Sequence, residues 1–398
     1  MKFAILGGSF DPIHRGHIKL AEAALQAGYD RIIFVPAFHS PFKSEAQRDS
    51  AAIRLEMILA AISADRRFTV DDTEIKRGGL SYTIDTIKDI SARYLPEGKP
   101  ALVLGDDLIA GFPKWKDADK IGFVSDILVA SREKNMNNFP YPHKLLNNET
   151  FELSSAAVRA LIASGKAWHE LTPNGVWNII EDRALYGCAP RPHSGTPCSG
   201  EALGGSGSAA QKNSISVSPS LVDIENKVRS MLSIRRFLHS RNVALHCADL
   251  AARFGFDVPK AYLAGISHDM AKELPCDRMI ELAQQDHLPF SPLELKKPSM
   301  LHGRAAAILI QECFGIDDAD VIEALRYHTS GRAGMGPLAK IVYLTDKIET
   351  GRSTVDEKLR ALAFGSSALA DLNELFDIVH KATLEFLKAR GLELIEWA

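Results

Sequence analysis

The stretch FAILGGSFDPIHRGH, residues 3–17, sets the architecture of the first half of the chain. Residues 3–6 are a short apolar run of the kind buried in a parallel sheet, and two glycines follow it directly. Residues 18–27 then carry apolar side chains at helical spacing, and Gly28 provides a stop. With the next apolar run at residues 32–35, this order predicts a βαβ unit with a right-handed crossover.

The same alternation continues to the end of the first half. Further apolar runs at residues 101–104 and 127–129 predict an α/β doubly wound parallel sheet, Rossmann-like, over residues 1–187. Residues 188–220 are dominated by Gly, Ser, Pro and Ala, which predicts a flexible linker with an r.m.s. span on the order of 30 Å. We therefore expect the parts on either side of it to move independently.

Residues 221–398 predict an all-α domain, because β-rich runs largely vanish. Helices with apolar faces are expected at residues 242–254, 259–271, 303–314, 338–348 and 368–390. A length of 398 residues with 46% apolar residues is ample for two or three cores.

Composition narrows the expected partners and compartment. The formal charge of −3 gives no global basic field, so nucleic acid and anionic membrane are not expected partners. Five cysteines, odd in number and unclustered, fit reduced thiols. With no signal peptide or membrane span in the sequence, a cytoplasmic protein is expected. Small-molecule nucleotides are the expected partners, and association into a homo-oligomer is left open.

The turn after the first strand predicts a phosphate site. Gly7, Gly8 and Ser9 let the backbone approach a phosphate closely, and the following helix adds its N-terminal N–H groups. His14 and His17 lie three residues apart on the same side of that helix. Two imidazoles there would contact a polyphosphate and stabilise charge on departing pyrophosphate. The alternative is a pair of solvated histidines at a helix cap.

These residues resemble the nucleotidylyltransferase superfamily, whose signature after the first strand reads His14-Arg15-Gly16-His17 here. Within it, the run is similar to bacterial nicotinate-nucleotide adenylyltransferases. The segments VPAFHSPFKS, EIKRGGLSYTIDTI, LGDDLIAGFPKW and LSSAAVR agree in order and spacing, so the resemblance spans nearly all of residues 1–187. It implies transfer of AMP from ATP to nicotinate mononucleotide, with Mg²⁺ accompanying the ATP.

The resemblance also implies roles for individual residues. The groups that would hold and activate the ATP phosphates are His14, His17, Lys43 and Arg159. The remaining substrate contacts would come from Gly7, Gly8, Ser9, Phe10, Tyr82, Thr83, Gly105, Asp107, Trp115, Ser154 and Ser155. Tyr82 and Trp115 would form the nicotinate pocket, although Trp115 also fits an ordinary packed aromatic.

Two positions depart from the pattern of that family. Phe42 replaces the usual histidine, and Ala156 replaces the usual threonine. Each change removes a polar contact worth roughly 0.5–1.5 kcal/mol. We expect weakened ATP affinity rather than loss of activity.

The second half offers a different chemistry. Four histidines and two aspartates occur in the order His239, His268, Asp269, His302, His328 and Asp346. Imidazole and carboxylate together suit Fe, Mn, Zn or Ni, and six ligands exceed the needs of one tetrahedral metal. A two-metal site bridged by Asp269 is therefore predicted, with Lys272 one turn after His268 to stabilise oxygen charge. The alternative is that several of these histidines are ordinary helix residues.

Their neighbouring sequences resemble bacterial HD-domain hydrolases that split diadenosine tetraphosphate symmetrically into two ADP. The matching runs are RRFLHSRNVA, GISHDMAKELP, MLHGRAAA, ALRYHTSGRAGM and YLTDKIETGR. The resemblance implies that the six residues above are metal ligands, that Asp269 and Lys272 are catalytic, and that Arg304, Thr329 and Arg352 contact phosphate. It also implies iron as the metal, with manganese as the other candidate.

Three hypotheses follow for the whole chain. The leading one is a bifunctional enzyme that makes deamido-NAD and hydrolyses diadenosine tetraphosphate. A second keeps the transferase but gives the helical domain another nucleotide or a cyclic dinucleotide as substrate. A third makes the helical domain a nucleotide-sensing or oligomerisation module.

Overall fold

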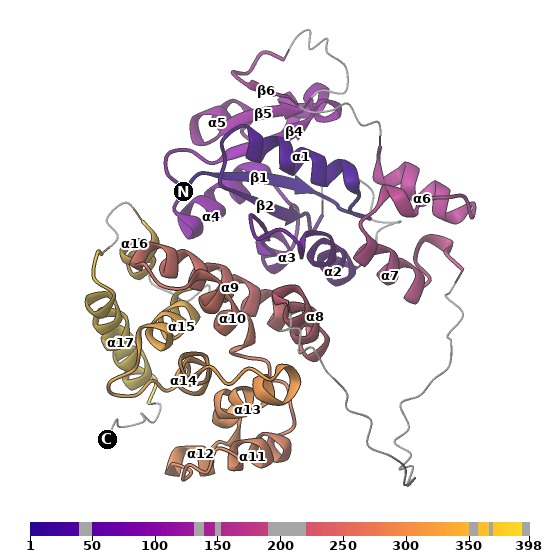
Figure 1. Cartoon of the computed structure of the whole chain (residues 1–398). Coiled ribbons are helices and arrows are strands. Elements are labelled where there is room, and N and C mark those ends of the chain that lie inside the picture. Colours follow the sequence, from indigo (N-terminus) through magenta and orange to yellow (C-terminus); the bar gives the residue numbers. More distant parts are fainter. Residues whose placement is uncertain are drawn as a thin grey trace, which may run out of the picture.

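The first half of the chain folds around a six-stranded parallel sheet (Figure 1). The structure is a computed structural model that describes residues 1–39, 50–130, 139–147, 153–189, 220–349, 357–365 and 369–391. The strands run in the order β3-β2-β1-β4-β5-β6. Their bounds are β1 Phe3–Gly8, β2 Arg31–Pro36, β3 Phe68–Val70, β4 Ala101–Gly105, β5 Asp126–Ala130 and β6 Lys144–Leu146. The predicted doubly wound α/β fold is confirmed.

Helices cover both faces of this sheet because the strand residues alternate in direction. Ala4 and Leu6 of β1 belong to one core with α1 (Arg15–Gln26), α2 (Ala51–Ile62) and α7 (Asn174–Asp182). Phe3 and Ile5 belong to the other core with α4 (Thr83–Tyr94) and α5 (Ala118–Val124). The remaining elements are α3 Thr73–Arg77, η1 Asp106–Lys114, α6 Ser155–Ala163, η2 His169–Leu171 and η3 Leu185–Gly187.

The strand order reverses direction between β1 and β4. In open α/β sheets, ligands bind beyond the carboxyl ends of the strands at such a switch point. Gly7 and Gly8 end β1, and Gly105 ends β4. Two of the predicted substrate-binding segments therefore meet at the position that the topology favours.

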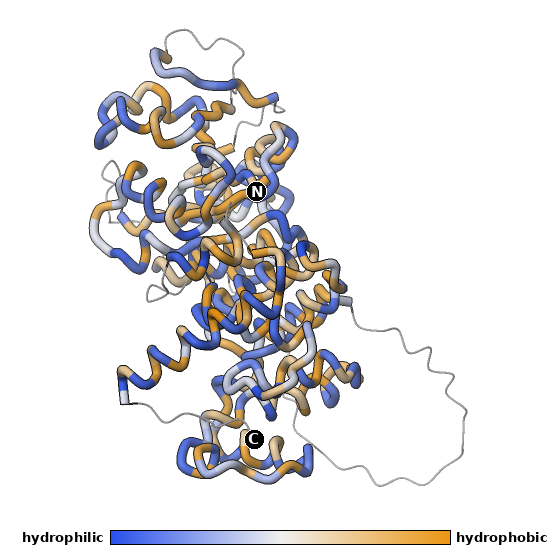
Figure 2. The backbone as a smooth tube through the Cα atoms, turned by 90° about the vertical axis from the view of Figure 1, so that its left-hand side faces the viewer, coloured by the Kyte–Doolittle hydropathy of each residue, from blue (hydrophilic) through white to orange (hydrophobic). Residues whose placement is uncertain are grey.

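The described residues from 220 onward are helical, as the sequence predicted. The elements are α8 Leu221–Met231, α9 Ile234–Phe254, α10 Val258–Ser267, α11 Cys276–Gln284, α12 Pro292–Lys296, η4 Pro298–Leu301, α13 His302–Phe314, α14 Ala319–Tyr327, α15 Pro337–Ile348, α16 Glu357–Phe364 and α17 Leu372–Ala389. Three predicted bounds were wrong. The helix expected at residues 242–254 begins at Ile234, capped by Ser233, and the one expected at 259–271 ends at Ser267. The helix expected at 368–390 begins at Leu372. Figure 2 shows apolar segments gathered in the interior of both halves.

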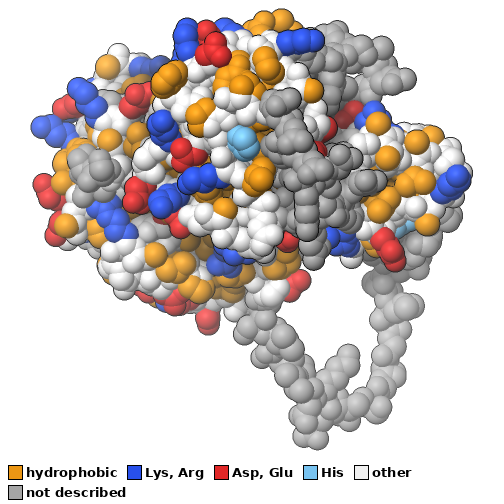
Figure 3. Space-filling model, turned by 90° about the horizontal axis from the view of Figure 1, so that it is seen from above, with side chains coloured by type: hydrophobic (Ala, Val, Ile, Leu, Met, Phe, Trp, Pro, Cys, Tyr) orange, Lys and Arg blue, Asp and Glu red, His pale blue; other side chains and the backbone are white. Residues whose placement is uncertain are grey.

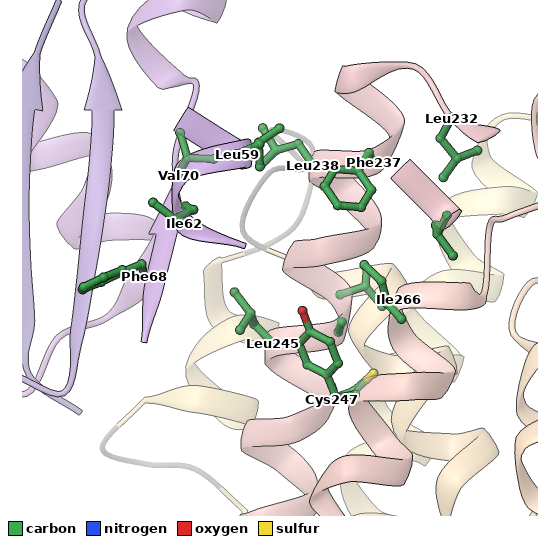
Figure 4. Packing of buried hydrophobic residues seen from close by; sticks show 14 of the residues in the cluster. Leu59, Ile62, Phe68, Val70, Leu232, Phe237, Leu238, Leu245, Cys247 and Ile266 are labelled. Carbon is green, nitrogen blue, oxygen red and sulfur yellow. The ribbon is translucent and has the colours of Figure 1, made fainter. Parts of the chain in front are cut away.

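The two halves share a buried interface, so the expectation that they move independently was wrong. Leu59, Ile62, Phe68 and Val70 belong to the same apolar core as residues of α9 such as Leu238 and Leu245. Figure 4 shows these side chains of α2 and β3 lying close to α9. Residues 190–219 lie outside the described part of the chain, so the linker itself stays a prediction.

Polar groups of α9 complete this interface. The guanidinium of Arg241, fully buried, donates to the carbonyl oxygens of Phe68 at 3.0 Å and Ile62 at 3.2 Å. Phe68 lies on the edge strand β3, and Ile62 ends α2, where its carbonyl also accepts from the Asp65 N–H at 3.3 Å. Arg31 of β2 forms a two-pronged ion pair with Asp249 of α9, at 2.9 and 2.8 Å.

The sequence predicted neither a membrane span nor a global basic field. Among them, the structure has no helix with both the length and the apolar character needed to cross a membrane. Figure 3, which looks down on the molecule from above, shows acidic and basic side chains interspersed on the coloured part of that face.

Candidate active sites

Four side chains hold the phosphate loop that follows β1, residues 9–14. Arg54 donates to the Ser9 carbonyl at 2.7 Å, and Tyr186 donates to the Asp11 carboxylate at 2.8 Å. From α6, the Ser155 hydroxyl donates to the Pro12 carbonyl at 2.9 Å, and Arg159 donates to the Asp11 carbonyl at 2.5 Å. These bonds fix the backbone that would face a phosphate.

The sequence analysis missed two of these four anchors. Arg54 and Tyr186 stand outside the quoted motifs, and nothing in their spacing marks them as partners of the loop. Ser155 was predicted to donate to phosphate, which stays a prediction, and in this structure its hydroxyl donates to the loop. Ser154 acts as the N-cap of α6, where its oxygen accepts from the Ala157 N–H at 3.1 Å.

His14 and His17 lie together at the start of α1. His14 is the N-cap residue, and its backbone N–H donates to Nδ1 of His17 at 3.2 Å. The two rings lie 3.8 Å apart, centroid to centroid, and the buried ring of Phe10 packs edge-on against His17 at 4.9 Å. The expectation that both imidazoles share one side of the helix is confirmed, and they lie at its positive end.

The two residues predicted to form the nicotinate pocket, Tyr82 and Trp115, lie just before α4 and just after η1. Trp115 follows the last residue of η1 and is half-buried against Phe112, with ring centroids 5.0 Å apart. Tyr82 precedes Thr83 at the start of α4, and the Lys116 ammonium lies 4.7 Å from its ring centroid. A nicotinate-binding role for Trp115 stays a prediction. Asp107 lies exposed just after β4, whereas Lys43 and Phe42 lie outside the described residues.

In the helical half, the six predicted metal ligands come together from separate helices. His239 lies within α9, His268 and Asp269 follow the end of α10, and His302 begins α13. His328 follows the end of α14, and Asp346 lies in the last turn of α15. All except His239 are nearly fully buried.

Two glycines allow the close helix crossings that pair the histidines. A Cβ on Gly265 of α10 would stand 2.6 Å from the Cα of Ala244 in α9. A Cβ on Gly303 of α13 would stand 2.7 Å from the Leu325 carbonyl oxygen in α14. The first crossing brings His268 to His239, and the second brings His302 to His328, with ring centroids 5.3 and 5.0 Å apart.

Asp269 lies between these two pairs. Its Oδ2 is 3.8 Å from Nε2 of His239 and 3.7 Å from Nε2 of His268. Its Oδ1 is 3.3 Å from Nε2 of His302 and 3.6 Å from Nε2 of His328. Asp346 adds an oxygen to the first pair, 3.2 Å from His239. The donor atoms form two groups that share one carboxylate.

Three of the histidines are oriented by the backbone. Nδ1 of His268, His302 and His328 each lies 2.7 Å from the carbonyl oxygen three residues earlier, that of Gly265, Ser299 and Leu325. A carbonyl only accepts, so Nδ1 carries the proton and Nε2 presents its lone pair to the cluster. Nε2 of His268 is buried without a hydrogen-bond partner among the described residues. This donor set fits a divalent metal.

Burial also keeps two of these ligands neutral. Desolvation lowers the pKa of His268 to about 3 and that of His302 to about 4. For Asp269, burial alone would raise the pKa, but the surrounding histidines outweigh it and hold the pKa well below its usual range. Neutral imidazole and ionised carboxylate are the forms that bind metals.

Partly exposed cations surround the buried cluster. Nζ of Lys272 lies 3.0 Å from Nε2 of His302, and Arg236 donates to Oδ2 of Asp269 at 2.8 Å. Lys347 donates to Asp346 at 2.9 Å. The Thr329 hydroxyl lies 2.9 Å from Nε2 of His328. Lys272 and Thr329 were expected here, whereas Arg236 and Lys347, although inside quoted motifs, were not singled out.

The phosphate contact expected of Arg304 stays a prediction, and in this structure the side chain is engaged elsewhere. Its guanidinium is buried and donates to the carboxylates of Asp286 and Glu294 and to the Leu288 carbonyl. These partners engage its donors and hold the segment before α13 against it. Arg352 lies outside the described residues.

Comparisons with known proteins agree with both sites. A cytidylyltransferase-like family model matches residues 5–161, and an HD domain model matches residues 236–351. The chain is thus a nucleotidyltransferase domain followed by an HD domain. A protein of Treponema pallidum described as a probable nicotinate-nucleotide adenylyltransferase is 38% identical over 202 residues, 47% of this chain and 99% of its own length. The chain belongs, through its first half, to the nicotinate-nucleotide adenylyltransferase family.

Other relatives cover the second half. A Mycoplasma genitalium protein described as a probable nicotinate-nucleotide adenylyltransferase/Ap4A hydrolase is 26% identical over 360 residues, 88% of each chain. A solved structure from Clostridium acetobutylicum, described as a predicted HD superfamily hydrolase involved in NAD metabolism, is 33% identical. It covers 44% of this chain and 91% of its own, with a TM-score of 0.41.

Proposed function

We propose that this chain is a bifunctional enzyme. Its first half transfers AMP from ATP to nicotinate mononucleotide, giving deamido-NAD and pyrophosphate. Its second half hydrolyses diadenosine tetraphosphate symmetrically to two ADP. The observation that carries the second activity is the carboxylate of Asp269, which offers one oxygen to each of two histidine pairs.

The transfer needs positioning and charge stabilisation rather than a covalent intermediate. A phosphate oxygen of the mononucleotide attacks the α-phosphorus of ATP in line, and the bond to pyrophosphate breaks. The loop held by Arg54, Ser155 and Arg159 would present its N–H groups to the phosphates. His14 and His17 would offset the charge that builds on the departing pyrophosphate, and Mg²⁺ accompanies the ATP.

For the hydrolysis, His239, His268 and Asp346 would hold one metal, and His302 and His328 the other, with Asp269 between them. Metals bound here would supply an activated water and offset phosphate charge. Imidazole and carboxylate ligands suit iron, with manganese as the alternative. Arg236, Lys272 and Lys347 would attract the polyphosphate and hold it over the cluster.

Nucleotide chromatography after incubation with diadenosine tetraphosphate and Fe²⁺ or Mn²⁺ tests the hydrolase. ADP as the sole product is expected. AMP plus ATP, or no turnover, would overturn this assignment. Hydrolysis of a cyclic dinucleotide instead would favour the alternative substrate, which the same cation-lined cluster also fits. A parallel incubation with ATP and nicotinate mononucleotide tests the transferase through release of pyrophosphate.

A further inference from the structure

One of the four cluster histidines is oriented differently from the others. His239 lies inside α9, where the carbonyl three residues earlier belongs to the helix and is not free to orient a ring. Its Nδ1 instead lies 3.2 Å from Oε1 of Glu349. An ionised carboxylate only accepts, so Nδ1 of His239 donates to Glu349, while its Nε2 lies 3.2 Å from Oδ1 of Asp346 and 3.8 Å from Oδ2 of Asp269.

The position of Glu349 is itself fixed. It follows the last residue of α15, is 2% exposed, and has an extended backbone. Arg360 of α16, also buried, donates to the carbonyl oxygens of Ile348 at 3.2 Å and Glu349 at 3.0 Å. A buried carboxylate without partners is costly, so its placement against the His239 ring is a specific feature of this cluster.

We propose that Glu349 is a positioning residue of the metal site. It holds the ring of His239 with Nε2 toward the cluster and gives this ligand a negatively charged partner. The other three histidines have neutral carbonyl partners. The inference rests on the proposed metal-dependent function and deepens it by making the two metal positions unequal.

The two metal positions should differ in how strongly their metal affinity depends on Glu349. A carboxylate partner raises the basicity of a ligating imidazole and fixes its tautomer. The position served by His239 and His268 should therefore depend on Glu349, whereas the position served by His302 and His328 should not. Loss of such an outer partner typically costs about 10–100-fold in metal affinity.

The experiment is a Mn²⁺ titration of the full chain after treatment with a chelator, with free Mn²⁺ measured by electron paramagnetic resonance. The unchanged protein should bind two Mn²⁺ ions. Glu349→Ala should weaken one of the two by about 10–100-fold and leave the other unchanged. In Glu349→Gln, the Mn²⁺ affinity of the weakened position should fall between that of the unchanged protein and that of Glu349→Ala. The amide oxygen of Gln still accepts from Nδ1 but carries no charge. Adenylyl transfer by the same molecules reports whether each variant has folded.

Glu225→Gln is the matched control. Glu225 is buried to a similar degree, at 4% exposed, but it accepts from Arg241 and Tyr262 rather than from a metal ligand. It should lower the unfolding midpoint without changing Mn²⁺ affinity. Unchanged affinity in folded Glu349→Ala, or equal weakening of both positions, would overturn the role of Glu349. No Mn²⁺ binding by the unchanged protein would overturn the proposed metal function, and this role with it.

Discussion

The two sites of this chain use opposite ends of helices. In the first half, α1 and α6 begin at the phosphate loop, with His14 and Ser154 as their N-cap residues. In the second half, α10 and α14 end at the metal cluster, with His268 and His328 as their C-cap residues. Helix N-termini favour anions and helix C-termini favour cations. The same backbone property therefore suits one site to polyphosphate and the other to metal ions.

The sites also differ in what carries the chemistry. The phosphate site depends on a backbone loop held by Arg54, Tyr186 and residues of α6. These anchors contact the loop itself and act on a phosphate only through it. The metal site depends on side-chain atoms that converge directly, and three of its rings use carbonyls at helix ends. A single ligand loss should therefore harm the metal site more than a single contact loss harms the phosphate site.

The largest effect is expected for His268→Ala. It removes a fully buried ligand, and the loss of a metal that offsets several kcal/mol of phosphate charge should cost about 10³-fold or more in hydrolysis of diadenosine tetraphosphate. Metal analysis should show reduced occupancy, while adenylyl transfer should continue. Hydrolysis that survives both His268→Ala and Asp269→Asn would rule out the metal mechanism.

The next effect concerns the interface, where the two halves meet. Arg241→Met leaves Glu225 buried beside Tyr262 alone and strips the Phe68 and Ile62 carbonyls of the guanidinium donor. We expect a loss of about 3–5 kcal/mol in urea unfolding.

Arg229→Met is the control for this interface variant. Arg229 donates to the Glu56 carbonyl at 3.4 Å and approaches the Glu56 carboxylate only at 4.0 Å, and its side chain is 25% exposed. It should cost less than about 1 kcal/mol. Equal stability of the two variants would show that Arg241 does not hold the halves together.

A smaller loss is expected for His17→Ala. Removal of one group that stabilises developing charge should lower adenylyl transfer by about 10²-fold, because His14 and the loop N–H groups remain. Pyrophosphate release measures the rate, and hydrolysis of diadenosine tetraphosphate by the same sample is the control. A transfer rate equal to that of the unchanged protein would favour the alternative in which these histidines are only a helix cap.

Features formed by residues close together in the sequence could be predicted, whereas contacts between residues far apart could not. The motif GGSFDPIHRGH is contiguous, so local periodicity placed the strand, the turn and both histidines correctly. The metal ligands are scattered, and only the family resemblance assembled them. The contacts of Arg54, Arg241 and Arg304 all join residues distant from the local pattern, and helical spacing indicates a face but not the partner across it.

Acid should weaken the interface through Asp249. Burial alone would raise the pKa of this carboxyl, but Arg31 and His246 outweigh it and lower the pKa to about 2. The unfolded pKa is about 3.9, so the contribution, roughly 3 kcal/mol, is present above pH ~4 and is lost as the pH falls through about 2.

Asp249→Asn should remove this dependence on pH. Unfolding free energies of both proteins, measured between about pH 6 and pH 2, should converge toward acid, because the ionised carboxyl contributes only at the higher pH. A difference that stays constant over that range would show that the Arg31–Asp249 pair does not contribute in this way.

The smallest effect is expected for Ala156→Thr, which restores the hydroxyl typical of the family. Ala156 is exposed on the first turn of α6, and the neighbouring Ser155 hydroxyl is already engaged by the Pro12 carbonyl. A new hydroxyl at 156 would therefore be available to ATP without disturbing the loop. We expect the KM for ATP to stay unchanged or fall, by no more than about 1 kcal/mol in binding.

Ala157→Thr supplies the comparison, because Ala157 is the next residue of the same turn and is also exposed. Both variants bear the same helix-propensity cost of a β-branched side chain, so the difference in KM between them isolates the hydroxyl at 156. A clear rise in KM for Ala156→Thr alone would mean that this position tolerates no larger side chain beside the phosphates. The absent threonine would then be an adaptation of this chain's loop rather than a lost contact.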